Sequence, residues 1–159
     1  MSELVDVLWE LEEEEDEALV MRVKSWGEAL LDVSKSESRT LSVVLCDDQT
    51  IRTLNQQWRD VDGPTDVLSF PMDEGESLDA GEALAPLGDI VISIETATQQ
   101  APRHDYSLEE ELRYLLVHGL CHLLGFDHGD PEEARAMREM ESKLITQLAP
   151  EQARPDTPY

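Results

Sequence analysis

The chain alternates short apolar runs, which are typical of β-strands, with longer segments whose apolar residues recur at helical spacing. Strands are expected at residues 4–9, 38–46, 66–70 and 87–94. The stretch between the last two, residues 71–86, is rich in Gly, Pro and acidic residues and predicts a long exposed loop. This mixture of strands and helices favours an α/β (α+β-like) domain, in which helices pack on one mixed sheet of about four strands. The pattern does not give the order of the strands.

Two helices are predicted in the first half of the chain. Apolar residues recur at helical spacing over residues 19–31. The acidic run before them, residues 12–17, is expected to form the solvated first turn of this helix. Asp47 or Asp48 is expected to cap a second helix, which carries its apolar residues on one face between residues 51 and 58.

A third helix is predicted to be the centre of the domain. Ser107 and Glu110 fit a capping box at its start. Seven leucines between residues 108 and 124 cover most of its circumference, so we expect the helix to be buried. Gly125 is expected to end it in a left-handed conformation.

The length of the chain favours a single domain. Asp130 and Pro131 supply a cap and a first residue for a last helix, which is expected to run to about Leu148. A chain of 159 residues suits one hydrophobic core, and we place the domain at residues 1–149. Residues 150–159 are rich in Pro and polar residues and are expected to form a flexible C-terminal tail.

Composition excludes several classes of protein. A hydrophobic fraction of 40% is enough to build a core and argues against global disorder. No apolar run approaches the roughly 20 residues of a membrane span, and the N-terminus lacks the pattern of a secretory signal. Two cysteines, Cys46 and Cys121, do not make a disulfide framework. These features predict a cytoplasmic protein with no membrane partner.

The net charge bears on nucleic-acid binding. The chain has 12 Lys and Arg against 36 Asp and Glu, which gives a formal net charge of −24. At long range this charge repels nucleic acids and anionic membranes. We therefore expect the isolated protein to bind generic RNA weakly and with a shallow dependence on salt, unless a metal, a basic patch or a partner acts locally.

Three of the four histidines lie within eleven residues, where the central helix ends. His118 and His122 are one helical turn apart and can face the same ion, and Gly125 lets the chain reverse so that His128 returns to the same point. Three imidazoles leave a fourth position open, which is typical of catalytic zinc. Zinc, one per chain, is the expected ion, although imidazoles also bind copper, nickel and iron. The alternative is three unrelated histidines that form hydrogen bonds in the core.

The spacing equals that of the metzincin proteases, H-E-x-x-H-x-x-G-x-x-H, except at one position. Gly119 stands where those enzymes carry the glutamate that takes a proton from the attacking water. Peptide hydrolysis would therefore need another base. Cys121 lies next to a histidine, but its direction on the helix favours a buried filler over a metal ligand.

The chain as a whole resembles the YbeY family of bacterial endoribonucleases and rRNA maturation factors. Four blocks in the family's order carry the resemblance over about residues 50–130: Leu54-Asn55 with Trp58-Arg59, the run Pro64 to Pro71 (PTDVLSFP), Leu87 to Ile90 (LGDI) with Ser93, and His118 to His128. Trp58, in place of the commoner tyrosine, is a departure from the pattern.

The resemblance implies a metal-dependent endoribonuclease that is specific for single strands and acts in 16S rRNA 3′-end maturation and ribosome quality control. It also implies a single zinc ion held by His118, His122 and His128. The implied partners are the 16S rRNA precursor, the small ribosomal subunit and its assembly proteins, with no role on DNA.

Two further residues are candidates for catalysis. Arg59 either clamps a phosphate, because a guanidinium pairs well with phosphate oxygens, or pairs with a nearby loop aspartate. Asp127, beside His128, is a candidate proton shuttle, but it could also orient a histidine or cap a loop. Structural roles are favoured for Asp66 and Ser69. Asp89 interrupts an apolar strand and is expected either to orient a histidine or to bond to a loop.

Two other functions agree with the same residues. One is a non-catalytic ribosome-assembly factor in which the zinc is structural. The other is a zinc hydrolase that acts on a different substrate. A labile zinc with an open coordination position favours catalysis over the first of these.

Overall fold

The computed structural model describes residues 4–36, 39–72 and 85–155 and contains one mixed sheet. The four strands are β1(Val5–Glu10), β2(Arg39–Cys46), β3(Val67–Pro71) and β4(Ala85–Ser93), and they lie in the order β1-β2-β4-β3. β1, β2 and β4 are parallel, and β3 pairs antiparallel with β4 at the edge. The predicted fold, a single α/β domain on a four-stranded mixed sheet, is confirmed.

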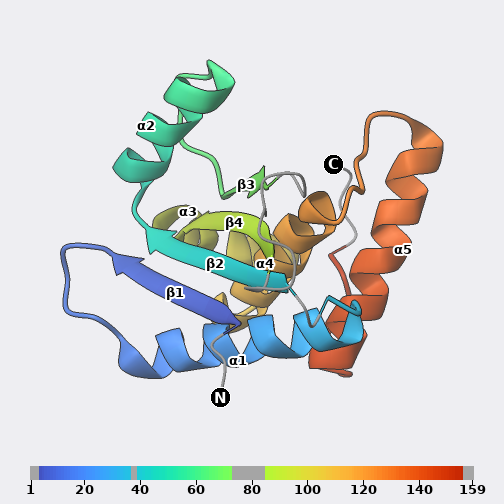
Figure 1. The fold of residues 1–159 in the computed structure, drawn as a ribbon. Coiled ribbons are helices and arrows are strands. Elements are labelled where there is room, and N and C mark those ends of the chain that lie inside the picture. Colours follow the sequence, from blue (N-terminus) through green and yellow to red (C-terminus); the bar gives the residue numbers. More distant parts are fainter. Residues whose placement is uncertain (1–3, 37–38, 73–84, 156–159) are drawn as a thin grey trace.

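Helices cover both faces of the sheet (Figure 1). One face carries the main core, which α1(Glu17–Val33), α4(Leu108–Leu123) and α5(Pro131–Leu148) share with the inward side chains of the strands. The other face carries α2(Asp48–Arg59) over a smaller apolar cluster that includes Ile51 and Val91. The predicted segments for these four helices are all helical in the structure.

The central helix is buried as its leucines predict. The side chains of four leucines in α4 are almost fully buried: Leu112, Leu115, Leu116 and Leu120. Ser107 caps the helix, and the reciprocal bond from the Ser107 N–H to the Glu110 carboxylate completes the capping box. The buried leucines therefore hold α4 rigidly, and with it the side chains of its last turn.

The structure differs from the sequence prediction in several segments before α4. The acidic residues 12–15 precede α1, because the side chain of Asp16 accepts the Leu19 N–H and starts the helix there. β4 begins at Ala85, within the predicted loop, and residues 73–84 of that loop lie outside the described residues. Two short elements, α3(Ile94–Gln100) and the 3₁₀ helix η2(Ala101–His104), join β4 to α4 and were not predicted.

The end of the chain is packed as far as the structure describes it. The side chain of Gln152 is buried, and the carbonyl of Ala153 accepts a hydrogen bond from the Tyr106 hydroxyl. Arg154 forms an ion pair with Glu141 in α5. The packed domain thus extends to residue 155, beyond the boundary predicted at 149, and residues 156–159 lie outside the described residues.

The α4 helix approaches the sheet closely at Gly119. A Cβ atom at this position would lie 2.8 Å from Cγ2 of Ile90 and 3.2 Å from Oγ of Ser69. The Ser69 hydroxyl also donates a hydrogen bond to the Gly119 carbonyl at 3.0 Å, which ties β3 to α4. Glycine at 119 is therefore required by packing, and a side chain there would face the sheet.

Replacing Gly119 by alanine is expected to destabilise the protein. The added methyl group overpacks a buried contact, which costs about 1–3 kcal/mol and outweighs the better helix propensity of alanine. Urea unfolding of the parent and the variant measures the difference. Gly63→Ala is the control, because a Cβ there meets nothing within 4 Å. Equal stability of Gly119→Ala and the parent would contradict this account of the packing.

Candidate metal centre

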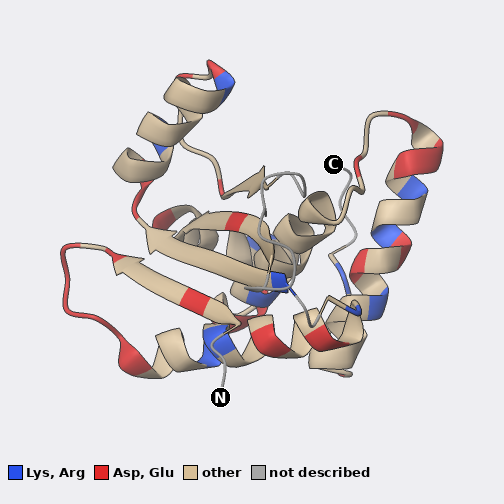
Figure 2. Cartoon of the chain, viewed as in Figure 1, with Lys and Arg blue, Asp and Glu red and all other residues tan. Residues whose placement is uncertain are grey.

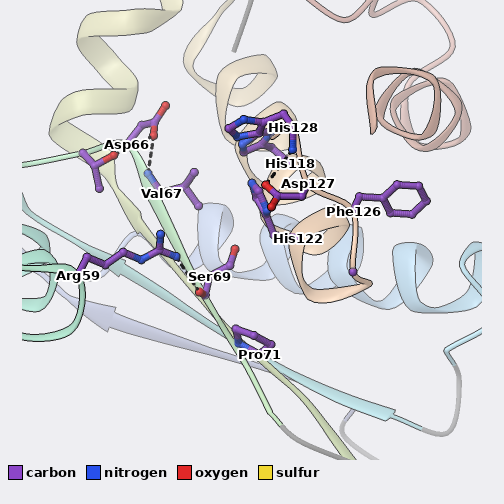
Figure 3. A pocket seen from close by; sticks show the side chains of 12 residues that line it. Arg59, Asp66, Val67, Ser69, Pro71, His118, His122, Phe126, Asp127 and His128 are labelled. Atoms are coloured by element: carbon purple, nitrogen blue, oxygen red, sulfur yellow. Dashed lines mark hydrogen bonds between the residues drawn. The ribbon is translucent and has the colours of Figure 1, made fainter. Parts of the chain in front are cut away.

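Three histidines meet at the C-terminal end of α4 (Figure 3). His118 and His122 lie one turn apart on the helix, and His128 returns from the loop that follows. One ring nitrogen from each histidine lies within 4.8 Å of the other two. The ring centroids of His118 and His122 are 4.8 Å apart, and those of His122 and His128 are 5.4 Å apart. The structure thus brings together the three residues that the sequence predicts as metal ligands.

The reversal of the chain after α4 positions the third histidine. Gly125 has a φ of +100°, a backbone conformation that favours glycine. Its N–H donates to the His122 carbonyl at 3.0 Å, and the Phe126 N–H donates to the Cys121 carbonyl at 2.9 Å. These two bonds satisfy carbonyls at the helix end and turn the chain back toward the pocket.

The donor set suits a divalent metal ion such as zinc. Nδ1 of His118 lies 2.5 Å from a carboxylate oxygen of Glu141, which leaves Nε2 of the same ring for an ion. Burial lowers the pKa of His122, and the nearby His118 and His128 lower it further, whereas the Asp127 charge opposes them. The neutral form of the imidazole, which is the form that ligates metals, is therefore favoured.

The lowered pKa of His122 predicts that the metal-free protein is sensitive to acid. The unfolded chain takes up a proton near the ordinary value of 6.5, whereas the folded chain resists it. The contribution to stability is therefore present above that value and is lost as the pH falls through the lower pKa of the folded state. Urea unfolding at about pH 7.5 and about pH 5.5 compares the metal-free parent with His122→Asn. The parent should lose more stability than the variant, and an equal loss in both would contradict the assignment.

The histidines line a pocket of about 560 Å³. Across this pocket, β3 and the end of α2 supply the opposite wall, as Figure 3 shows. Arg59 is the last residue of α2, and its guanidinium donates to the Ser69 carbonyl at 3.4 Å. The nearby Asp62 is instead paired with Arg52 at 2.8 Å. Arg59 lines the pocket, and within the described part of the chain no carboxylate forms an ion pair with it.

Asp127 lies beside the histidines in the same pocket. Its carboxylate accepts the N–H of His128 at 2.8 Å and so stabilises the loop that carries this histidine. The Asp127 charge opposes the lowering of the His122 pKa that burial causes, which agrees with the position of the two side chains in one pocket. Asp127 therefore caps the loop, and its carboxylate lies in the same pocket as the histidines.

Asp66 and Ser69 also line this pocket and make hydrogen bonds within the fold, whereas Asp89 lies elsewhere. The Asp66 carboxylate accepts the Val67 N–H at 2.7 Å, and the Ser69 hydroxyl bonds to Gly119. Asp89 is on the α2 face of β4, next to Trp58 and Phe70, because it shares that face with Val91 two residues along the strand. Asp89 therefore does not orient a histidine.

Cys121 is not part of the histidine cluster, as the sequence predicts. Its side chain is fully buried among the apolar residues of the main core. Burial raises the pKa of its thiol well above the ordinary value, so the thiolate that would bind a metal is disfavoured.

Two residues near the site were missed in the sequence. Glu141 contacts His118 from α5, and Arg154 contacts Glu141 from the end of the chain. A signal for Glu141 was present, because it stands on the buried face of α5 between Met137 and Leu144, where a carboxylate needs a partner. Arg154 gave no such signal, since its contact depends on how the last residues fold back.

Comparisons with known proteins agree with these features. The family model described as Endoribonuclease YbeY matches residues 9–149. A curated protein named Endoribonuclease YbeY from Pelotomaculum thermopropionicum is 46% identical over 134 residues, which cover 84% of this chain and 88% of the relative. A protein of the same name from Aquifex aeolicus is 44% identical over 129 residues, which cover 80% of this chain and 83% of the relative.

A solved structure shares the fold. The solution structure of TM1509 from Thermotoga maritima matches with a TM-score of 0.60 and 24% sequence identity, over 96% of this chain and 99% of that protein. The family match and the curated relatives confirm the family resemblance that the sequence motifs indicate. The chain therefore belongs to the YbeY family of endoribonucleases.

Proposed function

We propose that the chain is a zinc-dependent endoribonuclease that cleaves single-stranded RNA and acts in the cytoplasm in 16S rRNA 3′-end maturation and ribosome quality control. The observation that carries the proposal is the meeting of three histidine nitrogens within 4.8 Å of one another, in a pocket that Arg59 faces from the other side. Membership in an endoribonuclease family supports RNA as the substrate.

Each group in the pocket has a separate proposed role in RNA cleavage. A zinc ion held by the three neutral imidazoles would act as a Lewis acid, which would acidify water and polarise a phosphoryl oxygen. Arg59 is placed to bind the phosphate and stabilise the negative charge that develops on it. Asp127 is the carboxylate nearest in sequence to the ligands and is proposed to accept the proton of the attacking oxygen nucleophile. Position 119 cannot take this role, because it faces the sheet.

A purely structural zinc fits the pocket less well. Structural zinc sites are closed by four protein ligands, whereas only the three histidines form a ligand group here among the described residues. The 560 Å³ of open pocket next to them leaves room for a substrate. The geometry therefore favours catalysis over a role limited to docking.

The distribution of charge bears on how RNA reaches the pocket. Acidic residues dominate the loop between β1 and α1 and the first turns of α1 and α5 (Figure 2). Such a surface attracts basic proteins and repels free RNA at long range. We therefore propose that the RNA is presented by the small ribosomal subunit and its assembly proteins.

Among the described helices, none is long and apolar enough to cross a membrane.

A cleavage assay with matched RNA strands tests the proposal. The zinc-loaded protein is incubated with a labelled single strand and with the same strand annealed to its complement. We expect the protein to cleave the single strand but not the annealed duplex. A chelator should abolish this cleavage. A parallel preparation of His128→Ala controls for contaminating nucleases. An intact single strand would refute the nuclease assignment, and equal cleavage by His128→Ala would show that the activity does not come from this site.

A further inference from the structure

A fully buried carboxylate links the metal centre to the end of the chain. Glu141, in α5, has one carboxylate oxygen 2.5 Å from Nδ1 of His118 and the other 2.6 Å from Nε of Arg154. The exposed fractions of the three side chains are 0% for Glu141, 16% for His118 and 9% for Arg154. Water is thus largely excluded from this row of charged and polar groups.

We infer that Glu141 is a positioning residue of the metal centre and that Arg154 holds it in place, so that tight metal binding depends on residues 149–155, the C-terminal segment. The inference rests on the proposed function, because it requires the three histidines to bind a metal ion. Glu141 is not itself one of the three ligands.

The contact with Glu141 determines which atom His118 offers to an ion. A carboxylate accepts hydrogen bonds, so Nδ1 of His118 carries the proton and Nε2 keeps its lone pair. The same bond fixes the rotation of the ring and makes the imidazole a stronger donor to a metal. Loss of the carboxylate would remove this restraint on the orientation of the His118 ring relative to His122 and His128.

Arg154 makes the burial of Glu141 possible. A carboxylate that is completely removed from water is strongly destabilising unless an opposite charge and hydrogen bonds compensate it. The Arg154 guanidinium supplies both, and it is held in turn by a 2.7 Å bond to the Pro155 carbonyl and by its position over the Tyr114 ring. The carboxylate therefore has one fixed orientation, with His118 and Arg154 on its two oxygens.

The C-terminal segment is anchored by further contacts that bring Arg154 to this place. After α5 it turns back toward α4 (Figure 1). The side-chain amide of Gln152, which is only 3% exposed, accepts a bond from Arg113 and donates one to the Glu110 carbonyl, each at 2.9 Å. The Ala153 carbonyl accepts the Tyr106 hydroxyl. The N-terminal part of α4 thus contacts the last described residues of the chain.

The chain offers a matched control for this network. Glu111 in α4 is also fully buried, and its carboxylate lies 2.7 Å from Nδ1 of His104. His104 is outside the group of metal ligands. Glu111→Gln therefore perturbs the same kind of buried pair without touching the metal centre.

The test measures zinc affinity by competition with a chromophoric chelator, for the full chain and for Glu141→Gln, Arg154→Met and Glu111→Gln. Melting of each metal-free protein is recorded alongside. Cobalt(II), bound in place of zinc, reports the ligand geometry through its visible absorption. Glu141→Gln would place a donating NH₂ group against either His118 or Arg154, where an accepting carboxylate oxygen is required. We expect Glu141→Gln to weaken zinc binding roughly 10–100-fold and to change the cobalt spectrum. Arg154→Met should weaken zinc binding by a smaller factor, and Glu111→Gln should bind zinc as the parent does.

Each outcome decides the inference. Parent-like zinc affinity in Glu141→Gln would overturn it, and so would an equal loss in Glu111→Gln, which would mean that affinity merely follows stability. If Glu141→Gln does not fold, the spectrum and affinity of Arg154→Met carry the test. Parent-like values there would overturn the role of the C-terminal segment. Failure of the proposed function looks different, because the parent itself would then bind no zinc or cleave no RNA.

Discussion

Replacing His118 by alanine is expected to remove the metal from the centre and to abolish RNA cleavage. The change deletes one of the three proposed ligands, whose ring nitrogens lie within 4.8 Å of one another, and it also removes the contact between His118 and Glu141. Zinc affinity should fall by more than the roughly 10–100-fold caused by losing a residue that only supports a ligand. Zinc content after dialysis and the rate of cleavage, measured on the same preparation, check this expectation.

His104→Ala is the matched control for this change. It also deletes a histidine that contacts a buried glutamate, Glu111, and so removes one partner of a buried carboxylate, as His118→Ala does for Glu141. It should therefore lower the melting temperature as His118→Ala does but keep its zinc and its activity per folded molecule. Full zinc retention in His118→Ala would exclude this residue as a ligand.

Reversing the charge of Arg59 is expected to slow cleavage while the fold and the zinc remain intact. Loss of a charge-assisted hydrogen bond to phosphate costs at least about 1.5–3 kcal/mol, which is roughly ten- to a hundredfold in rate. Arg59→Lys should fall between the parent and Arg59→Glu, because lysine keeps the charge but loses the paired geometry. Cleavage rate, zinc content and melting temperature are measured together.

Arg52→Glu separates the local effect of Arg59 from that of net charge. Arg52 lies on the same helix, is exposed and pairs with Asp62, away from the pocket. Both substitutions change the net charge of the chain equally, so any general repulsion of RNA is shared. A parent-like rate for Arg59→Glu, or an equal loss for Arg52→Glu, would remove Arg59 from the active site.

Local signals in the sequence predicted the elements that carry the histidines. The capping box at Ser107, the leucines of α4 and the left-handed Gly125 act over a few residues, so their consequences can be derived from spacing alone. The same holds for the Asp130 cap that begins α5. The metal centre was therefore predictable, since two ligands share one helix and the third follows its end.

The rest of the site depends on contacts between distant parts of the chain. Arg59 lies at the end of α2 and contacts the Ser69 carbonyl of β3, and the place of β3 beside β4 is set by tertiary packing. Glu141 lies 23 residues from His118, and Arg154 a further 13 residues along. The short α3 helix has no apolar repeat and starts from a cap, Ser93, that also ends β4. The spacing of residues along the sequence does not predict these long-range contacts or this short helix.

Titration of the metal-free protein with zinc, while cleavage of a single-stranded RNA is followed, tests the central claim most directly. Our account predicts no cleavage without metal and a rate that rises with added zinc until one ion per chain is bound, with no response in His118→Ala. Cleavage that proceeds at full rate in the metal-free protein, or that responds to zinc equally in the parent and in His118→Ala, would contradict the claim that the three histidines form the catalytic metal centre.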